Sequence, residues 1–230
     1  METLTKANIR RGRTEIDVPY QDRTITFVYP AKGPGIYQGV MDQVSLDGLL
    51  RPTSAQTISL VDSAFQDENE PEFKDVLTKF KNRYLWTSTE NLSVPKQGII
   101  VYDNINGKMP STSKELLEMY EAKVPEVRLV PYGFKTGSQS ISDFVKNPYV
   151  IAQFGEEQMD LVARVAEKFK KIPYVTALQN VDSETKRYTA LDSNRDLGRG
   201  LDVIGLGRGY NWLGCALGVR NTGEASRAKK

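Results

Sequence analysis

Residues 188–220, YTALDSNRDLGRGLDVIGLGRGYNWLGCALGVR, differ in composition from the rest of this 230-residue chain. Seven of the 18 glycines fall between Gly198 and Gly218, and four arginines are interspersed with them. From Arg187 to Gly223 there is no Lys, Glu, Gln or Met. Because glycine tolerates backbone conformations that other residues avoid, this density predicts an irregular segment, which the apolar stretch LGCALGVR ends as a closing strand.

Adenine-specific mutagenesis of Asn codons would explain the missing residue types. Changes confined to the adenines of AAC or AAT cannot produce Lys, Glu, Gln, Met or Trp. From Ser193 to Arg220 every residue except Trp212 belongs to the set that can be reached in this way. We therefore expect Trp212 to be a fixed residue of the scaffold. The alternative interpretation is a Gly-rich surface segment with no such history.

In this composition the segment resembles the variable region of the variable proteins of diversity-generating retroelements, in which a reverse transcriptase rewrites the 3′ end of a gene with adenine-specific errors. The resemblance covers about 33 residues and is compositional. It implies a single C-type lectin-like domain that displays variable residues from loops. The stretches LLRPTSAQTISLVDSAFQ and YGFKTGSQ are also loosely similar to uncharacterised archaeal proteins, which implies an archaeal or archaeal-virus source and no activity.

The resemblance implies a variable region of about residues 192–215 that binds a protein or glycan ligand. Arg, Tyr, Gly, Ser and Asn also dominate natural binding loops, because they combine large contact area with adaptable hydrogen bonding. The expected ligand-binding positions are Asn194, Arg195, Asp196, Leu197, Gly198, Gly200, Asp202, Ile204, Leu206, Gly207, Arg208, Gly209, Tyr210, Asn211 and Leu213.

The bulk composition excludes several classes of catalytic site. The chain has no histidine, which removes Ser-His-Asp and Cys-His sites and histidine-bearing zinc sites. The single Cys215 excludes an intramolecular disulfide and the cysteine pair that sulfatase-modifying relatives of the C-type lectin fold need. We expect no cofactor and no metal. The net charge of +2 does not indicate a nucleic-acid partner, and no membrane span or signal peptide is expected.

Two other functions remain open. Asp192, Asp196 and Asp202, with Arg199 and Lys135, could serve a metal-dependent nuclease or phosphoryl-transfer enzyme, although the nearby arginines would compete for the carboxylates. The basic residues of the two termini could bind nucleic acid. Three motif-like stretches miss their required spacings: the calcium-loop-like 103–107, the phosphate-loop-like 133–140 and the dinucleotide-loop-like 205–209.

The rest of the chain predicts one α+β domain over residues 14–221, after a flexible basic arm (1–13) and before a polar tail (222–230). We expect a mixed or antiparallel sheet with flanking helices and with LGCALGVR beside the N-terminal hairpin. The expected hairpin spans 14–29 and is ended by residues 30–35. Two helices follow, one capped by Thr53 and one with Pro71 as its first residue, and each carries one apolar stripe. The other elements expected are strands at 84–89, 98–102, 127–132, 173–178 and 186–191, a turn at 90–97, and helices at 112–120 and 156–171.

Overall fold

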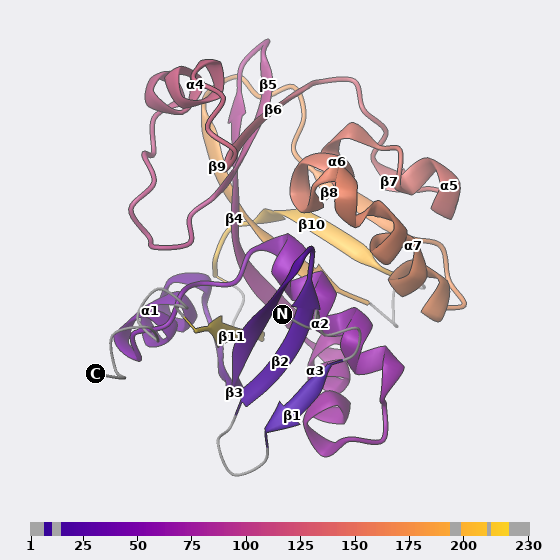
Figure 1. Ribbon diagram of the computed structural model, residues 1–230. Coiled ribbons are helices and arrows are strands. Elements are labelled where there is room, and N and C mark those ends of the chain that lie inside the picture. The colour runs from indigo at the N-terminus through magenta and orange to yellow at the C-terminus, as the bar shows by residue number, and fades with distance from the viewer. Residues whose placement is uncertain (1–6, 11–14, 194–198, 211–212, 221–230) are drawn as a thin grey trace.

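The computed structural model describes residues 7–10, 15–193, 199–210 and 213–220. It is a mixed α+β structure in which helices pack around one branched sheet of 11 strands (Figure 1). The strands are β1 (Asn8–Arg10), β2 (Glu15–Tyr20), β3 (Arg23–Gly35), β4 (Tyr84–Val94), β5 (Gly98–Asp103), β6 (Val127–Pro131), β7 (Gly137–Ser138), β8 (Tyr174–Ala177), β9 (Thr185–Asp192), β10 (Asp202–Gly207) and β11 (Gly214–Val219).

Four of the helices follow the sequence prediction. Those expected after Thr53, from Pro71, after Thr112 and after Glu156 are confirmed, α1 and α6 were not predicted, and the four-residue α5 follows the turn at Ser140. The α-helices are α1 (Tyr37–Leu46), α2 (Ser54–Gln66), α3 (Pro71–Asn82), α4 (Ser113–Glu121), α5 (Ile141–Phe144), α6 (Pro148–Phe154) and α7 (Met159–Lys168), which follows a 3₁₀ turn at Glu156–Gln158.

The sheet is organised around β4, which has three neighbouring strands. The main path runs β1-β2-β3-β11-β4-β9-β10-β8-β7, and β5 and β6 branch from the far end of β4. Strand β9 pairs antiparallel with both the first and the later residues of β4. On the other side of β4, the first residues pair in parallel with β11 and the later residues pair antiparallel with β5. The sheet is therefore mixed, as the sequence predicts.

The closing strand β11 lies inside the sheet. It pairs antiparallel with β3 of the N-terminal hairpin, which confirms the expected position of LGCALGVR. All six residues of β11 are buried, so neither alternating set of side chains faces solvent. The last strand of the chain therefore joins the N-terminal hairpin to the rest of the sheet.

Helix α2 is buried on nearly every side. Thr53 and Gln56 form the predicted capping box, with the Gln56 backbone N–H donating to Thr53 Oγ1 at 3.1 Å and the Thr53 N–H donating to Gln56 Oε1 at 3.0 Å. The prediction of one apolar stripe is wrong, because strands and three other helices, α3, α6 and α7, surround α2. Small residues on the remaining faces, such as Ser59 and Ala64, allow this close approach.

Three strand limits differ from the prediction. Strand β3 continues through the segment expected to end it, because Pro30 and Pro34 fall between the residues that pair with β11. Strand β4 continues to Val94 through the predicted turn, because Leu92 and Val94 are buried and paired with β5. Residues 8–10, in the expected flexible arm, form β1 against β2.

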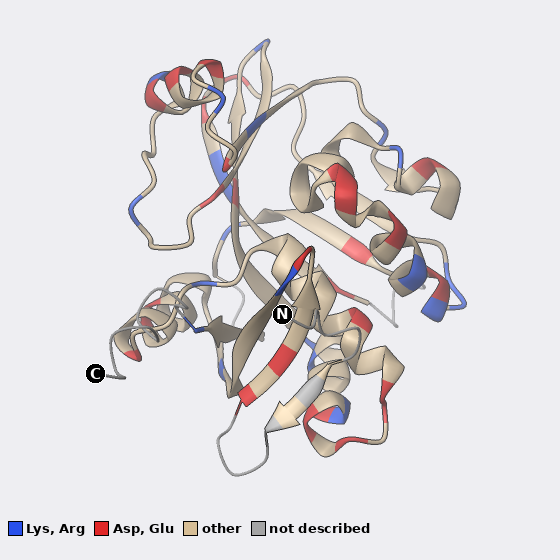
Figure 2. Cartoon of the chain, viewed as in Figure 1, with Lys and Arg blue, Asp and Glu red and all other residues tan. Residues whose placement is uncertain are grey.

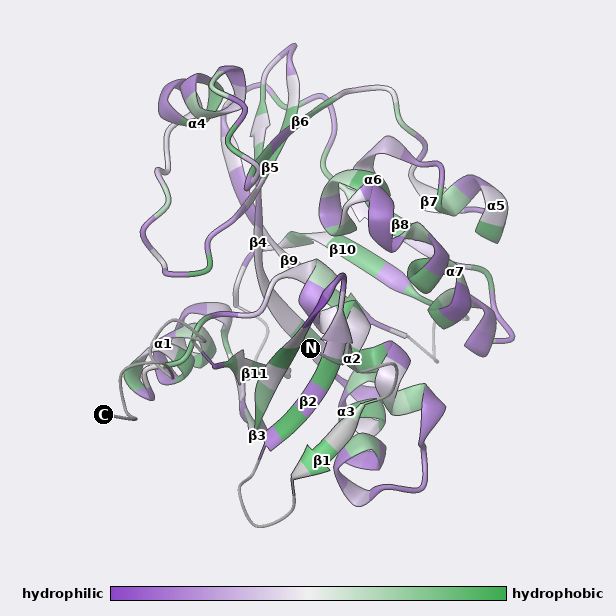
Figure 3. Cartoon of the chain, viewed as in Figure 1, coloured by the Kyte–Doolittle hydropathy of each residue, from purple (hydrophilic) through white to green (hydrophobic). Residues whose placement is uncertain are grey.

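Strand β10 was missed because its sequence, DVIGLG, lies within the segment expected to be irregular. Val203 is fully buried, and the strand pairs with β9 on one side and β8 on the other. Helix α1 carries a signal that was overlooked, since Tyr37, Val40, Met41 and Val44 are buried at helical spacing. Figure 3 shows the green apolar stretches of β2, β10 and β11 near the centre of the molecule.

Candidate functional site

The structure describes nine of the fifteen predicted ligand-binding positions. Asn194, Arg195, Asp196, Leu197, Gly198 and Asn211 lie outside the described residues, as does Trp212. Among the other nine, the exposed residues are Arg208, Tyr210 and Leu213, in the connection between β10 and β11. Tyr210 and Leu213 have exposed fractions of 76% and 51%, high values for large apolar side chains. We call residues 208–210 and 213, which carry these exposed side chains, the display turn.

The remaining predicted positions are covered to different degrees. Gly200, Asp202 and Gly209 are buried, and Ile204, Leu206 and Gly207 are half-buried. Asp202 has no exposed surface. None of these three positions offers a side chain to a ligand, because the two glycines carry none and the Asp202 carboxylate is enclosed where β10 pairs with β8 and β9.

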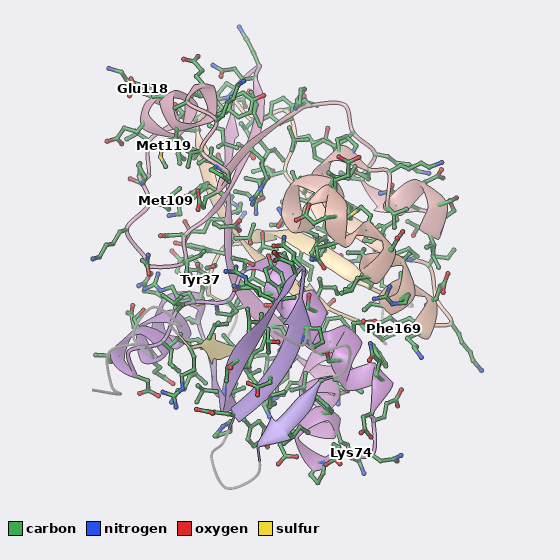
Figure 4. The ribbon with its side chains drawn as sticks, in the orientation of Figure 1. Tyr37, Lys74, Met109, Glu118, Met119 and Phe169 are labelled. Carbon is green, nitrogen blue, oxygen red and sulfur yellow. The ribbon has the colours of Figure 1, made fainter. Side chains whose placement is uncertain are left out.

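The display turn is supported by an aromatic base made of Tyr37, Trp86 and Tyr188. The ring of Tyr37 stacks on that of Tyr188 at 3.8 Å between centroids and meets the edge of Trp86 at 5.7 Å. The backbone N–H of Tyr37 donates to the carbonyl oxygen of Gly209 at 2.9 Å. This bond ties the backbone of the turn to the base without involving any side chain of the turn. Figure 4 labels Tyr37 between α1 and the loop that carries Met109.

Glycines allow the turn to lie directly on the base. Gly209 has a φ of +78°, and a Cβ there would come within 3.0 Å of the Tyr188 ring. A Cβ on Gly207 would lie 2.6 Å from the carbonyl oxygen of Tyr188 and 3.0 Å from Trp86. These two glycines are therefore required by the backbone path and by packing.

The buried carboxylate of Glu90 holds the aromatic base in place. Glu90 is 1% exposed, and its Oε1 accepts hydrogen bonds from the Tyr37 hydroxyl and from Asn104 Nδ2, both at 3.0 Å. Its Oε2 forms an ion pair of 2.6 Å with Lys186 Nζ. Burial, and secondly the negative charge of Glu90, raise the pKa of Tyr37 well above its usual value, so this hydroxyl remains a donor. The base is thus fixed by packing and by charged hydrogen bonds.

Arg208 of the display turn lies beside a second arginine, Arg187 of β9. Gly207 faces Tyr188 across the β9–β10 ladder, which brings the next residue, Arg208, toward Arg187. Burial and the neighbouring charge of Arg208 lower the pKa of Arg187. Neither guanidinium has a carboxylate partner among the described residues. Figure 2 shows the basic stretch of β9 as a blue band. This edge can bind carboxylates, sulfates or phosphates bidentately.

Two of the three aspartates proposed for an enzyme are direct neighbours. Asp192 on β9 faces Asp202 on β10, whereas Asp196 lies outside the described residues. Asp202 accepts from Arg199 Nη1 at 2.8 Å and from Thr176 Oγ1 at 3.2 Å, while Asp192 Oδ1 has no hydrogen-bond partner in the described structure. Arg199 is held over the Tyr174 ring at 3.8 Å.

The environment of this pair favours a neutral Asp192. Burial, and secondly the charge of Asp202, raise the pKa of Asp192 to about 8, against the smaller opposing effect of Arg199. Burial also raises the pKa of Asp202, which the hydrogen bond from Arg199 opposes. Within the described residues, no group of three or more His, Cys, Asp or Glu side chains could hold a metal ion. The described part of the pair is thus buried, and its Asp202 carboxylate is bound by Arg199.

Two of the motif-like stretches have structural roles. Asp103 accepts hydrogen bonds from Thr89 Oγ1 at 2.6 Å and from Arg128 Nη1 at 2.8 Å, so its carboxylate holds β4, β5 and β6 together. In the stretch 133–140, Ser140 Oγ accepts from the Asp143 N–H at 3.1 Å and caps α5, as expected for a turn before a helix. Lys135 uses its carbonyl oxygen to accept from Asn147 Nδ2 at 2.7 Å.

The described residues contain no helix with the length and apolarity needed to cross a membrane. Comparisons of the chain with protein-family models, curated proteins and solved structures found no significant match. The features of the structure that indicate a function are the display turn, its aromatic base and the arginine pair.

Proposed function

We propose that this protein is the ligand-binding variable protein of a diversity-generating retroelement, with a C-type lectin-like domain and no catalytic activity. The observation that carries the proposal is the contrast within the connection between β10 and β11. Its exposed side chains, Arg208, Tyr210 and Leu213, project from a backbone that fixed residues elsewhere in the chain hold in place. Exchange of exposed side chains therefore leaves the supporting contacts intact.

The position of β11 supports the same proposal. A variable segment can be rewritten safely only if the chain on both sides of it is firmly held. Strand β10 is held by β8 and β9, and β11 is held by β3 and β4. The display turn thus connects two strands that are each paired on both sides. A rigid scaffold of this kind tolerates sequence variation in the loop that it carries.

The packing narrows the set of exchangeable positions. A side chain at Gly207 or Gly209 would collide with the aromatic base, and Asp202 is paired with Arg199. Among the described residues, we therefore assign variation to Arg208, Tyr210 and Leu213. Tyrosine and arginine in these exposed positions would bind a protein or glycan by stacking and bidentate hydrogen bonds.

The test is to sequence the 3′ end of the gene in many copies from one source population, with the flanking DNA. We expect substitutions at adenine-derived positions of codons 208, 210 and 213, constant codons 207, 209 and 214, and a template repeat beside a reverse-transcriptase gene. A uniform 3′ end without a template nearby would refute the proposal. So would equal variation at the exposed and the packed codons.

The facing aspartates support a second candidate, the metal-dependent nuclease or phosphoryl-transfer enzyme. Its one favourable observation is that Asp192 Oδ1 has no hydrogen-bond partner beside the carboxylate of Asp202. Calorimetric titration with Mg²⁺ or Mn²⁺ tests it. Binding that is lost in Asp192→Asn and in Asp202→Asn would favour the enzyme, whereas absence of binding at millimolar metal would remove it.

A further inference from the structure

A cationic cavity lies where α3 and α7 end. Its volume is about 420 Å³, within the range of small-ligand sites. None of its lining residues belongs to the display turn or the aromatic base. The lining residues are Thr78, Lys81, Asn82, Lys168, Phe169, Lys170, Lys171 and Ser193.

The described residues that line the cavity include four lysines and no acidic residue. Lys81 and Lys168 lie in the last turns of their helices, where cations are favoured by the helix dipole. That effect offsets only part of the positive charge, since two helix C-termini contribute roughly half a negative charge each, against the three charges of Lys81, Lys168 and Lys170. An excess of positive charge therefore remains in the cavity.

Three of these lysines have no internal counter-ion. Lys81, Lys168 and Lys170 form no ion pair with any described residue, and Lys81 instead lies over the Phe65 ring at 5.3 Å. Lys79, only two residues before Lys81, forms an ion pair with Asp75 on its own helix. Lys81, Lys168 and Lys170 are thus available to an external anion, unlike Lys79.

The walls of the cavity are fixed by packing and backbone hydrogen bonds. The ring of Phe169, labelled in Figure 4, packs against those of Phe65 and Phe80 at 5.4 and 5.6 Å between centroids. This packing positions the lysines on either side of Phe169. The Ser193 N–H donates to the carbonyl oxygen of Phe80 at 3.1 Å. The Gly200 N–H donates to that of Ile172 at 3.0 Å, which ties the chain after Lys171 to the sheet. The cavity is therefore present before a ligand arrives.

We infer that this cavity binds a small ligand carrying a polyphosphate group, such as inorganic triphosphate or a nucleoside triphosphate. Several adjacent negative charges on one small group match several lysine ammonium groups around one cavity. The site is built from residues outside the display turn. Its four lysines lie outside the expected variable region of about residues 192–215, so the site does not depend on the proposed function.

The test is calorimetric titration of the full chain with inorganic triphosphate, at low salt and at about 0.15 M salt, where charges beyond about 8 Å are screened. The test variant is Lys81→Gln/Lys168→Gln/Lys170→Gln. The matched control is Lys74→Gln/Lys114→Gln/Lys146→Gln, which removes the same charge from three exposed lysines outside the cavity. Circular dichroism confirms that both variants fold.

We expect the cavity variant to bind triphosphate roughly tenfold more weakly or worse, because three close charges are lost, and the control to bind within about twofold of wild type. Equal losses in both variants would overturn the site, since net charge alone would then explain binding. Absence of binding by wild type at millimolar triphosphate would also overturn it. If a single-stranded oligonucleotide bound more tightly than triphosphate and lost affinity in the cavity variant, the ligand of the cavity would be nucleic acid and not a small molecule.

Discussion

Strand β11 and the turn before it have the same kind of sequence and opposite roles. Both are rich in glycine and lack Lys, Glu, Gln and Met, yet every residue of β11 is buried while Arg208, Tyr210 and Leu213 are exposed. The difference comes from their neighbours, since β3 and β4 cover β11, whereas the described contacts of the turn with the aromatic base are made by Gly209, through its carbonyl oxygen and its close approach to Tyr188. Composition therefore identifies a segment that could be diversified, and packing decides which of its positions can change.

The largest effect is expected within β11. A Cβ on Gly214 would overlap the indole nitrogen of Trp86, whose N–H donates to the carbonyl oxygen of Gly35 at 3.2 Å. We expect Gly214→Ala to lower the free energy of unfolding by about 3 kcal/mol, measured by urea denaturation. Gly39→Ala is the control, because its Cβ would find only Ile36 at 3.7 Å and alanine favours the helix. Equal stability of the two variants would contradict the close packing of β11.

The next effect concerns the start of β10. Arg199→Ala leaves Asp202 buried without its charged partner, and we expect a loss of about 2 kcal/mol in the free energy of unfolding near pH 8. The loss should shrink near pH 5, because a buried Asp202 with a raised pKa can take up a proton instead. Arg164→Ala, at a pair whose arginine is 53% exposed, should cost less than about 1 kcal/mol. A loss that does not depend on pH would argue against this account.

A smaller effect of opposite sign is expected at Asp192. Its pKa is raised from 3.8 to about 8, so the folded state holds a proton that the unfolded state releases, and stability falls as pH rises between these values. We expect Asp192→Asn to gain roughly 1–2 kcal/mol at pH 8 and to flatten this decline, as measured by urea denaturation across the pH range. Asp182→Asn, at an exposed loop residue, serves as the control. An unchanged pH dependence in Asp192→Asn would refute the assignment.

The smallest effects are expected in the display turn. Arg208→Ala, Tyr210→Ala and Leu213→Ala should each change the free energy of unfolding by less than about 0.5 kcal/mol, because their side chains face solvent. Thermal denaturation of the three variants and of Tyr188→Ala checks this. The Tyr188 variant should be clearly destabilised, since it loses the stack on Tyr37. If the turn variants were as unstable as Tyr188→Ala, this turn could not be a display surface.

The fold was predictable where local signals are strong. Three elements can be predicted from a few neighbouring residues: the helix with the capping box of Thr53 and Gln56, the helix that begins at Pro71, and β5 with its unbroken apolar run. The missed elements have weaker signals or conflicting ones. Strand β10 contains two glycines that favour an irregular segment, and only its pairing with β8 and β9 supplies the missing stability.

The candidate site was predicted as fifteen positions chosen by composition and not by exposure. Codon composition marks a segment without reference to burial, so it gave equal weight to Tyr210 and to Asp202. The aromatic base could not be found in this way, because Tyr37, Trp86 and Tyr188 come from three distant parts of the chain. The cationic cavity likewise needs two helix ends to meet.

The sequence alone determined the mixed α+β class, the pairing of the last strand with the N-terminal hairpin, and the segment of unusual composition. Only the tertiary structure decided which residues of that segment are exposed, why Gly207 and Gly209 must remain glycine, and that Asp192 and Asp202 face each other. The physical reason is that periodicity, caps and composition act over a few neighbouring residues. Burial and strand register depend instead on partners that the chain brings together from far apart.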